Sequence, residues 1–379
     1  MSERRVDVAI LGGGLASGLL ARQLRRQVPE ASVAVFEKSP ERRYKVGEAM
    51  VEIASNYFIR KAGLSTYLFD EHLPKNGLRL FFDTPEKDAE LTAMSEIGTD
   101  RAPPTPSFQL NRSKLDADLR EMNAKAGAEV NVGWTAKDVR LGRGGEPHRF
   151  AAVRDDGERR EYRARWLIDA TGRASTLARA LDLRFEETEH QCAAVWGRFT
   201  GVLDIDSIAD DPWRRRARYV ARILSTNHFC YPGYWIWFIP LGKGVTSVGV
   251  VGLKEHFRRG MRTQEGFRAF LDEHAAVRML LEKAEPLDID GYTQLAYGTK
   301  RFFSEDRWAL VGEAAAFTDP FYSPGSDFIA LECDYVTDLV ARDVRGEPAD
   351  RLAERTRTYD EFLRFRWEAN MLVYRGLYG

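Results

Sequence analysis

The stretch Val6-Asp7-Val8-Ala9-Ile10-Leu11-Gly12-Gly13-Gly14-Leu15-Ala16-Ser17-Gly18 decides the fold. Residues 6–11 form a short run rich in β-branched side chains and predict a strand that ends at the glycines. The apolar residues between Leu15 and Leu24 have helical spacing, and residues 32–36 predict a second strand. A strand, a glycine turn, a helix and a strand in this order are typical of the start of a doubly wound α/β sheet.

The glycine turn indicates a pyrophosphate-binding site. Gly12 and Gly14 allow the backbone to approach a phosphate, and the following helix directs its amide-rich end toward it. Ser17 stands where the third glycine of such turns is usual, and it is small enough for close helix packing. Glu37 ends the second strand and can accept hydrogen bonds from an adenosine ribose. We therefore expect a dinucleotide site, with a plain glycine-rich turn as the alternative.

Composition excludes several classes of protein. The chain has 379 residues with 56 basic and 57 acidic side chains, and this balance argues against a nucleic-acid or anionic-membrane binder. No apolar run approaches the roughly 18 residues that a membrane-spanning helix needs. The three cysteines, Cys192, Cys230 and Cys333, are widely spaced and form no CxxC, so we expect no disulfide framework and no metal site. These features predict a cytoplasmic protein.

Three further stretches direct the dinucleotide prediction toward FAD. Residues 166–173 predict a strand ending in the Ala-Thr-Gly turn of two-dinucleotide-fold flavoproteins. Residues 310–320 resemble the second flavin motif of these proteins, with Glu313 in place of the usual aspartate. Arg112 resembles the arginine of a helix that contacts the cofactor. Each stretch alone could be an ordinary turn or helix, but the three in this order predict FAD.

Four more stretches identify a family. They are Val46-Gly47-Glu48, Pro74-Lys75-Asn76-Gly77, Trp235-Ile236-Trp237-Phe238-Ile239-Pro240 and Asp319-Pro320-Phe321-Tyr322-Ser323-Pro324-Gly325-Ser326. With the motifs above, they resemble the flavin-dependent halogenases, within the wider class built like para-hydroxybenzoate hydroxylase. The resemblance runs from about residue 5 to about residue 345. It implies that the cofactor-binding residues are Gly12, Gly14, Ser17, Glu37, Gly47, Arg112, Asp169, Gly172, Gly312, Glu313, Pro320, Gly325 and Ser326.

The resemblance also implies four catalytic residues: Glu48, Lys75, Trp235 and Trp237. The amine of Lys75 would hydrogen-bond hypohalous acid or take the halogen as a chloramine, and burial would lower its pKa. Strand alternation places Trp235 and Trp237 on one face, where they would separate the flavin from the substrate chamber. The alternatives are a surface-loop lysine and an ordinary core strand.

Halide binding is implied for Ser323, Gly325 and Ser326, which precede or begin a predicted helix. Pro324 lies within this turn and has no N–H, so one halide donor of the usual pair is missing. Ala49 replaces the serine of the halogenase stretch, and Tyr322 stands where free-tryptophan halogenases carry a glutamate. The latter argues against free tryptophan as the substrate.

The predicted fold class is α/β. A Rossmann-like FAD domain of the two-dinucleotide-binding type is interleaved with a β-rich substrate domain and followed by a helical C-terminus. The expected divisions are residues 1–75, 107–185 and 295–345 for the FAD-binding domain, residues 76–106 and 186–294 for the substrate domain, and residues 346–379 for the C-terminal segment. Many halogenases continue past this point with helices over the substrate chamber, so we expect a chamber that is more open or is closed by a partner.

The predicted function is halogenation of an electron-rich aromatic small molecule of secondary metabolism, such as a phenol, a pyrrole or a carrier-tethered acyl group. It would use reduced flavin, O2 and chloride or bromide. No second glycine motif for NAD(P)H is present, so the resemblance implies a separate NAD(P)H-dependent flavin reductase. The alternatives are a flavin hydroxylase, an oxidase or dehydrogenase without halide, and a non-enzymatic flavoprotein.

Overall fold

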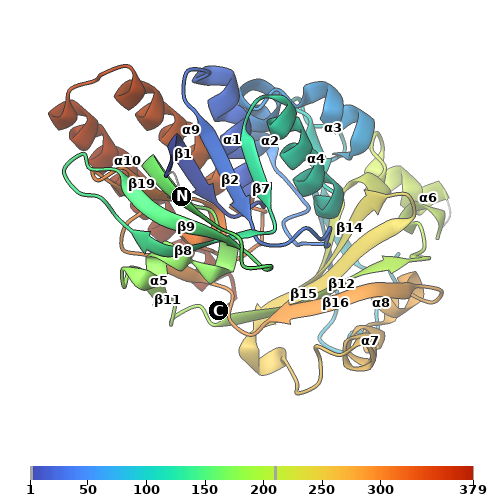
Figure 1. Cartoon of the computed structure of the whole chain (residues 1–379). Coiled ribbons are helices and arrows are strands. Elements are labelled where there is room, and N and C mark those ends of the chain that lie inside the picture. Colours follow the sequence, from blue (N-terminus) through green and yellow to red (C-terminus); the bar gives the residue numbers. More distant parts are fainter. Residues whose placement is uncertain (1–2, 209–210, 379) are drawn as a thin grey trace.

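The computed structural model describes residues 3–208 and 211–378, in which two large β-sheets are joined by helices (Figure 1). The first sheet has eight strands in these ranges, with β18-β19-β10-β1-β2-β7 in spatial order, β9 paired to β10, and β8 paired to β9. Its strands are β1 (Arg4–Leu11), β2 (Val33–Glu37), β7 (Glu129–Val132), β8 (Trp134–Arg140), β9 (His148–Arg154), β10 (Arg159–Asp169), β18 (Phe303–Ser304) and β19 (Trp308–Leu310).

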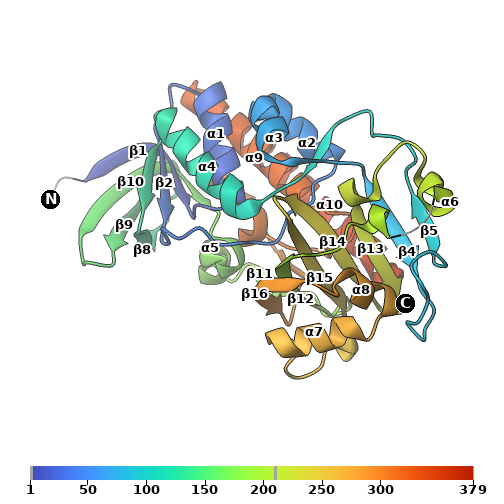
Figure 2. The same ribbon diagram turned by 90° about the vertical axis from the view of Figure 1, so that its right-hand side faces the viewer.

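The central strands of this sheet are parallel, as the predicted doubly wound fold requires. β1 pairs in parallel with β2 and β10, and β10 with β19, so the carboxyl ends of these strands meet at one edge. Helix α1 (Leu15–Gln27) lies between α4 (Arg112–Lys125) and α9 (Gly325–Val344) and packs against both (Figures 1 and 2). The α/β fold class predicted from the sequence is confirmed.

The second sheet contains seven strands of the described chain in the order β16-β12-β15-β14-β13-β4-β5. These strands are β4 (Leu78–Phe82), β5 (Ser95–Gly98), β12 (Cys192–Thr200), β13 (Thr226–Tyr231), β14 (Tyr234–Gly242), β15 (Val245–Leu253) and β16 (Glu285–Tyr292). Helices α7 (Gln264–Asp272) and α8 (Ala275–Leu280) cover its outer face (Figure 2). The inner face packs toward the first sheet and shares its hydrophobic core.

Two short ladders mark the places where the chain passes between the sheets. β3 (Leu73–Lys75) pairs with β6 (Ser107–Gln109), and β11 (Arg184–Glu186) pairs with β17 (Tyr297–Thr299). The chain therefore leaves the first sheet and returns to it at adjacent points of each ladder. We propose that the domain division follows these ladders, which lie at or close to the boundaries expected from the sequence.

The alternation along β14 separates two cores. Trp235, Trp237 and Ile239 belong to the core between the sheets, whereas Ile236 and Phe238 belong to the core beneath α7 and α8. Because successive side chains of a strand point to opposite faces, a strand apolar at every position joins both cores.

The C-terminal helix α10 (Ala349–Leu377) packs against α9 and β18. Its buried residues Trp367, Met371 and Tyr374 face the loop that precedes α9, and the Tyr374 hydroxyl donates to the Phe321 carbonyl oxygen at 2.7 Å. The helical C-terminus was predicted. Helix α10 covers this side of the core.

Gly249 makes room for the two indole rings that flank it. In β15 it pairs with Trp237 on one side and Trp196 on the other, and an added Cβ would lie 2.2 Å from the Trp237 ring. Because neither strand can withdraw, the indole would have to rotate.

We expect Gly249→Ala to destabilise the protein by about 1–3 kcal/mol through overpacking and to change the near-UV circular dichroism of the tryptophans. The control is Gly376→Ala on exposed α10, where an added Cβ meets no described atom within 4 Å. Equal melting temperatures for the two variants would contradict this packing.

Candidate active site

The glycine turn after β1 is held open by its backbone geometry. Gly12 has φ +104°, and an added Cβ would lie 2.3 Å from the Ala170 carbonyl oxygen. Gly14 is different, because the nearest described atom to an added Cβ is 3.8 Å away. Within the described chain no side chain caps the start of α1, so the N–H groups of its first turn can serve a ligand.

Glu37 closes the other side of this turn. Its Oε2 accepts from the Gly13 N–H at 2.6 Å and its Oε1 accepts from the Ser39 N–H at 2.8 Å. Each carboxylate oxygen keeps a second lone pair for another donor. Ser17 lies buried in α1, where Oγ has no hydrogen-bond partner in the described residues, as suits a residue that provides small size alone.

A long cleft extends from this turn and suits an adenine dinucleotide. Its lining includes Gly12, Gly14, Glu37, Arg112, Arg120, Gly172, Arg173 and Glu313. Nη1 of Arg173 is buried with no hydrogen-bond partner in the described chain, so it is available to an anionic ligand. The open approach at Gly14 and this unpaired guanidinium nitrogen together fit a pyrophosphate-bearing cofactor such as FAD.

A second, mostly apolar cavity adjoins the cleft. The two share Leu15, Val46, Arg112, Trp196, Tyr292, Glu313 and Ile329 as lining residues. The second cavity lies against the inner face of the seven-stranded sheet, since β12, β13, β14 and β15 all contribute to its wall. A cofactor that fills the cleft can therefore extend into a chamber between the sheets.

Arg112 lies where cleft and cavity meet. Its guanidinium forms two hydrogen bonds with the Asp116 carboxylate, at 2.9 and 3.2 Å, and donates to the Val46 carbonyl oxygen at 2.9 Å. Gly47 has φ +86°, and an added Cβ there would lie 2.9 Å from Nη1 of Arg112. Arg112 therefore fixes the Val46–Gly47 backbone at this junction.

Glu48 is fully buried in the cavity wall and is paired with an arginine that the sequence analysis missed. Nε of Arg198 donates to Oε1 of Glu48 at 2.9 Å, and Nη1 donates to Asp288 at 3.2 Å. Burial raises the pKa of Glu48, although the Arg198 guanidinium opposes that rise. A lone arginine at an inward position of the apolar strand β12 was the available signal.

The two later flavin motifs have different positions. Gly312, with φ +65°, and Glu313 both line the chamber, and the Gly312 N–H donates to the buried carboxyl of Glu332. Asp169, expected to bind the cofactor, is not part of the described lining of either cavity. Its carboxylate instead accepts from Thr171 N and Leu177 N, so it holds the turn around Gly172.

Lys75 is among the largest fully buried side chains, at 2% exposure. Its Nζ donates to the Met50 carbonyl oxygen at 2.8 Å. Burial lowers the pKa of Lys75 to about 8, against the opposing charges of Glu52 and Asp327. The amine lies behind the chamber wall, because the described lining of the cavity includes Ser326 and His228 but not Lys75 itself.

Trp235 and Trp237 form one wall of the chamber with their ring centroids 5.8 Å apart. The Trp237 indole N–H donates to Ser247 at 3.1 Å, and that of Trp235 donates to the Tyr378 hydroxyl at 2.6 Å. Satisfied indole nitrogens hold both rings in place.

The turn before α9 also lines the chamber. Pro320, Ser323, Gly325 and Ser326 all contribute to the chamber wall. Ser323 has φ +57°, and the Ser326 Oγ is buried with no hydrogen-bond partner in the described residues. An unpartnered hydroxyl therefore lies at the amide-rich start of α9, in a residue that lines the cavity. Tyr322 is exposed and outside the described lining.

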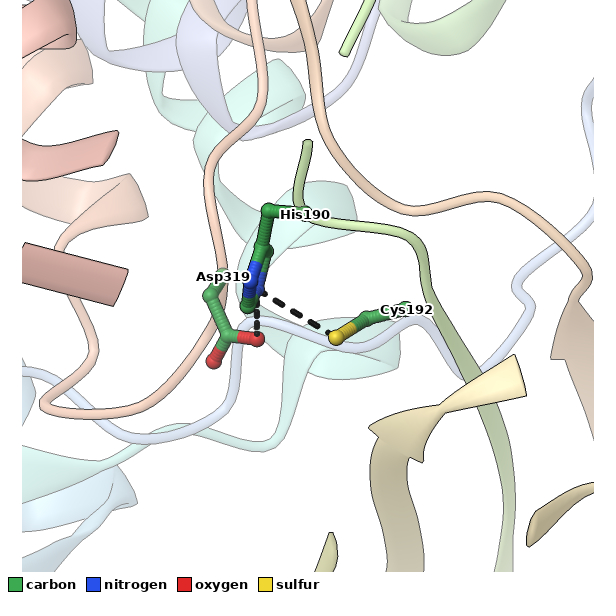
Figure 3. A group of neighbouring side chains, drawn as sticks. All are labelled: His190, Cys192 and Asp319. Atoms are coloured by element: carbon green, nitrogen blue, oxygen red, sulfur yellow. Dashed lines mark hydrogen bonds and ion pairs between the residues drawn. The ribbon is translucent and has the colours of Figure 1, made fainter. Parts of the chain in front are cut away.

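Asp319 belongs to a buried cluster in which His190 lies between Asp319 and Cys192 (Figure 3). Its Oδ2 lies 2.9 Å from the Nε2 of His190 and accepts from the Tyr378 hydroxyl at 3.0 Å, while the Cys192 Sγ lies 3.3 Å from Nε2. These are metal-ligand types, but their polar atoms already bond one another. Because Tyr378 also accepts from Trp235, the cluster links the C-terminus to the indole wall.

Several residues of the chamber were not predicted from the sequence. His228 lines the cavity from β13, and Trp196 lines it from β12. Trp367 closes part of it from α10, so the expectation of a more open or partner-closed chamber gives way to a chamber partly covered by the chain itself. An alternating polar pattern in β13 was the only available signal for His228.

The glycine turn allows a direct test of the dinucleotide site. We expect Gly12→Ala to lower the melting temperature of the apoprotein, because the new Cβ meets backbone and the φ is unfavourable for alanine. Gly14→Ala should leave that temperature unchanged but weaken FAD binding at least tenfold, because its methyl group enters the phosphate approach. Flavin fluorescence titration measures the affinity, and unchanged affinity of Gly14→Ala would contradict the site.

Comparisons with known proteins agree with this geometry. The FAD binding domain family matches residues 5–328. Among curated relatives, the flavin-dependent halogenase chlA of Dictyostelium discoideum is 29% identical over 94% of this chain and 63% of its own length. A 1H-pyrrole-2-carbonyl-[peptidyl-carrier protein] chlorinase of Pseudomonas fluorescens is 27% identical over 86% of this chain and 73% of its length.

The solved structure of halogenase PltM has the same fold, with a TM-score of 0.84 at 18% identity, covering 98% of this chain and 76% of that one. The match to the chlA relative, by contrast, covers less than two thirds of that relative's length. No helix within the described ranges has the length and apolarity to cross a membrane. The chain belongs to the FAD-binding domain family, whose cofactor is FAD, and the relatives and the solved structure named above are halogenases.

Proposed function

We propose that the protein is an FAD-dependent halogenase that uses reduced flavin, O2 and chloride or bromide to halogenate an electron-rich aromatic ring. The observation that carries the proposal is the dinucleotide cleft that opens into an indole-walled chamber with a buried amine behind its wall. The names of the curated relatives support it, since they include a chlorinase, a brominase and a tetracycline halogenase.

The residues of the cleft fit FAD, and each group of residues would hold one part of the cofactor. The Gly12–Gly14 turn and Arg173 would hold the pyrophosphate, and Glu37 the ribose. When bound, reduced FAD supplies with O2 the oxidising power that turns halide into an electrophilic halogen species. Glu48 and Arg112 hold the loop at the cavity junction, where burial and ion pairing keep water away from the chamber.

Lys75 would carry the electrophile. A pKa of about 8 leaves about a tenth of the amine neutral at pH 7, far more than for an ordinary lysine, and only the neutral amine has the lone pair that a chloramine requires. Its distance from bulk water would protect the reactive species. Reaching the chamber requires Nζ to leave the Met50 carbonyl oxygen, which is a side-chain rotation rather than a fold change.

The turn before α9 would hold the halide through the amides of Gly325 and Ser326, the Ser326 hydroxyl and the neighbouring Ser323. Pro324 at the N-cap position supplies no N–H, which favours the second candidate function: a flavin hydroxylase, oxidase or dehydrogenase of the same fold that uses no halide. The two candidates differ in whether halide enters the product.

Substrate and partners follow the same proposal. The relatives act on different rings, including a pyrrole attached to a carrier protein and a tetracycline, so a free phenol and a carrier-tethered ring both remain candidates. A separate NAD(P)H-dependent flavin reductase would supply the reduced cofactor. We propose a cytoplasmic location, which suits three free cysteines, of which Cys192 and Cys333 are fully buried.

The deciding experiment is aerobic turnover of the purified protein with FAD, a flavin reductase, NADH and a panel of phenols and pyrroles, with and without bromide. We expect a product with the paired bromine isotope masses that disappears without bromide. A hydroxylated product, or a product whose mass and rate do not respond to halide, would establish the second candidate function instead.

The role of Lys75 has its own test. We expect Lys75→Ala to retain FAD binding and aerobic flavin oxidation but to form at least a hundredfold less halogenated product. Without the amine, the hypohalous acid formed at the flavin would escape from the protein before it reached the substrate. Lys87→Met, which removes a partly buried amine beneath the other face of the second sheet, is the matched control and should behave as wild type. Equal product from both variants would remove Lys75 from the mechanism.

The burial of Lys75 also predicts how stability depends on pH. The shift from 10.5 to about 8 corresponds to roughly 3 kcal/mol. Between these values the unfolded chain binds the proton more strongly than the folded protein does, so deprotonation relieves the cost of burial as the pH rises. The stability of Lys75→Met relative to wild type should therefore be highest below pH 8 and should fall by pH 9.5. Melting curves at pH 7 and 9.5 measure this difference, and a constant difference would show an amine that is not buried.

A further inference from the structure

The chamber contains a buried imidazole that differs from the other buried histidines of the described chain. Each of those forms a hydrogen bond through its ring, His72 with Asn111 N, His148 with the Arg307 carbonyl oxygen, His190 with Asp319 and His274 with the Tyr234 hydroxyl. The His228 side chain is only 3% exposed, yet its Nδ1 has no hydrogen-bond partner among the described residues. His72 also has a buried ring nitrogen without a partner, Nε2, but its Nδ1 is satisfied. The His228 ring has no hydrogen bond to any described residue, which leaves it available to a ligand in the chamber.

The surroundings of His228 keep its ring neutral and direct it to the chamber. Burial lowers its pKa to about 3, with a further contribution from the Lys75 charge. A neutral imidazole offers one N–H donor and one nitrogen acceptor. His228 lines the chamber directly, beside Trp235 at a centroid distance of 4.8 Å and Phe321 at 5.6 Å.

The chamber lining indicates which ligand this imidazole would receive. Its walls near β13 and α9 are aromatic, formed by Trp235, Trp237, Phe328 and Trp367. The one arginine or lysine in the described lining is Arg112, and its guanidinium is already paired with Asp116. A carboxylated ring would therefore find no free cation, whereas a neutral ring with a hydroxyl group would find both aromatic walls and a hydrogen-bond partner.

We propose that His228 is a substrate-binding and specificity-determining residue that hydrogen-bonds a hydroxyl group of an aromatic substrate, which makes the substrate a phenol. This inference rests on the proposed function, because it names the ring that the chamber would halogenate. The hydrogen bond orients the ring between the Trp235 wall and the side from which Lys75 is reached. The hydrogen bond polarises the hydroxyl O–H bond without transferring its proton, because the imidazole is a weak base, and this polarisation raises the electron density of the ring.

Binding to the oxidised FAD-loaded protein tests the inference without turnover. Calorimetry would compare 1,3,5-trihydroxybenzene with 1,3,5-trimethoxybenzene, whose oxygens cannot donate. We expect wild type to bind the trihydroxy ring, His228→Phe to bind it about tenfold more weakly, and His228→Gln, whose amide can still accept, to lose no more than a few fold. The trimethoxy ring should bind both wild type and His228→Phe equally weakly.

The control is Cys230→Ala, which lies two residues further along β13 on the same face but outside the described cavity lining, and should bind as wild type. Flavin absorbance and melting curves check that each variant folds and retains FAD. Equal affinity of His228→Phe and wild type for the trihydroxy ring, equal weakening for both rings, or failure of wild type to bind it would overturn the inference. The bromide turnover assay is independent, so halogenation of a pyrrole by wild type would leave the proposed function intact while refuting the role of His228.

Discussion

The structure depends on one packing interaction, the apposition of the inner face of the seven-stranded sheet to the dinucleotide-binding half. Inward side chains of β12, β13, β14 and β15 form a layer that neither half completes alone. Gly249 leaves space within that layer for the indoles of Trp196 and Trp237. The cavity exists because rigid, close-packed rings cannot collapse into it.

Burial in this layer determines the electrostatics of the site. Charged groups occur there in pairs, such as Glu48 with Arg198 and Arg112 with Asp116, because an unpaired buried charge is costly. Among the described residues the Lys75 amine donates to a carbonyl oxygen alone, and its burial favours the neutral form. The same low-dielectric surroundings strengthen the attraction within the ion pairs and lower the pKa of the Lys75 amine.

The sequence predicted the local features of the fold and site well. The glycine turn, the parallel sheet and the two-faced strand β14 each follow from spacing within a few residues. Contacts between distant segments could not be predicted in this way. Arg198 reaches Glu48 across 150 positions, Tyr378 reaches Asp319 across 59, and Asp169 turned out to hold its own turn. Such partners depend on how the two sheets meet, which no local pattern encodes.

We propose that the flavin ring and the halide both lie in the indole-walled chamber, with the halide at the start of α9. Diffraction from crystals of the FAD-loaded protein soaked in bromide, recorded at the bromine absorption edge, tests this most directly. The account predicts a flavin ring between Glu48 and Glu313 and an anomalous peak against Gly325 and Ser326. A flavin ring that stays outside the chamber, or bromide found only at the protein surface, would contradict it.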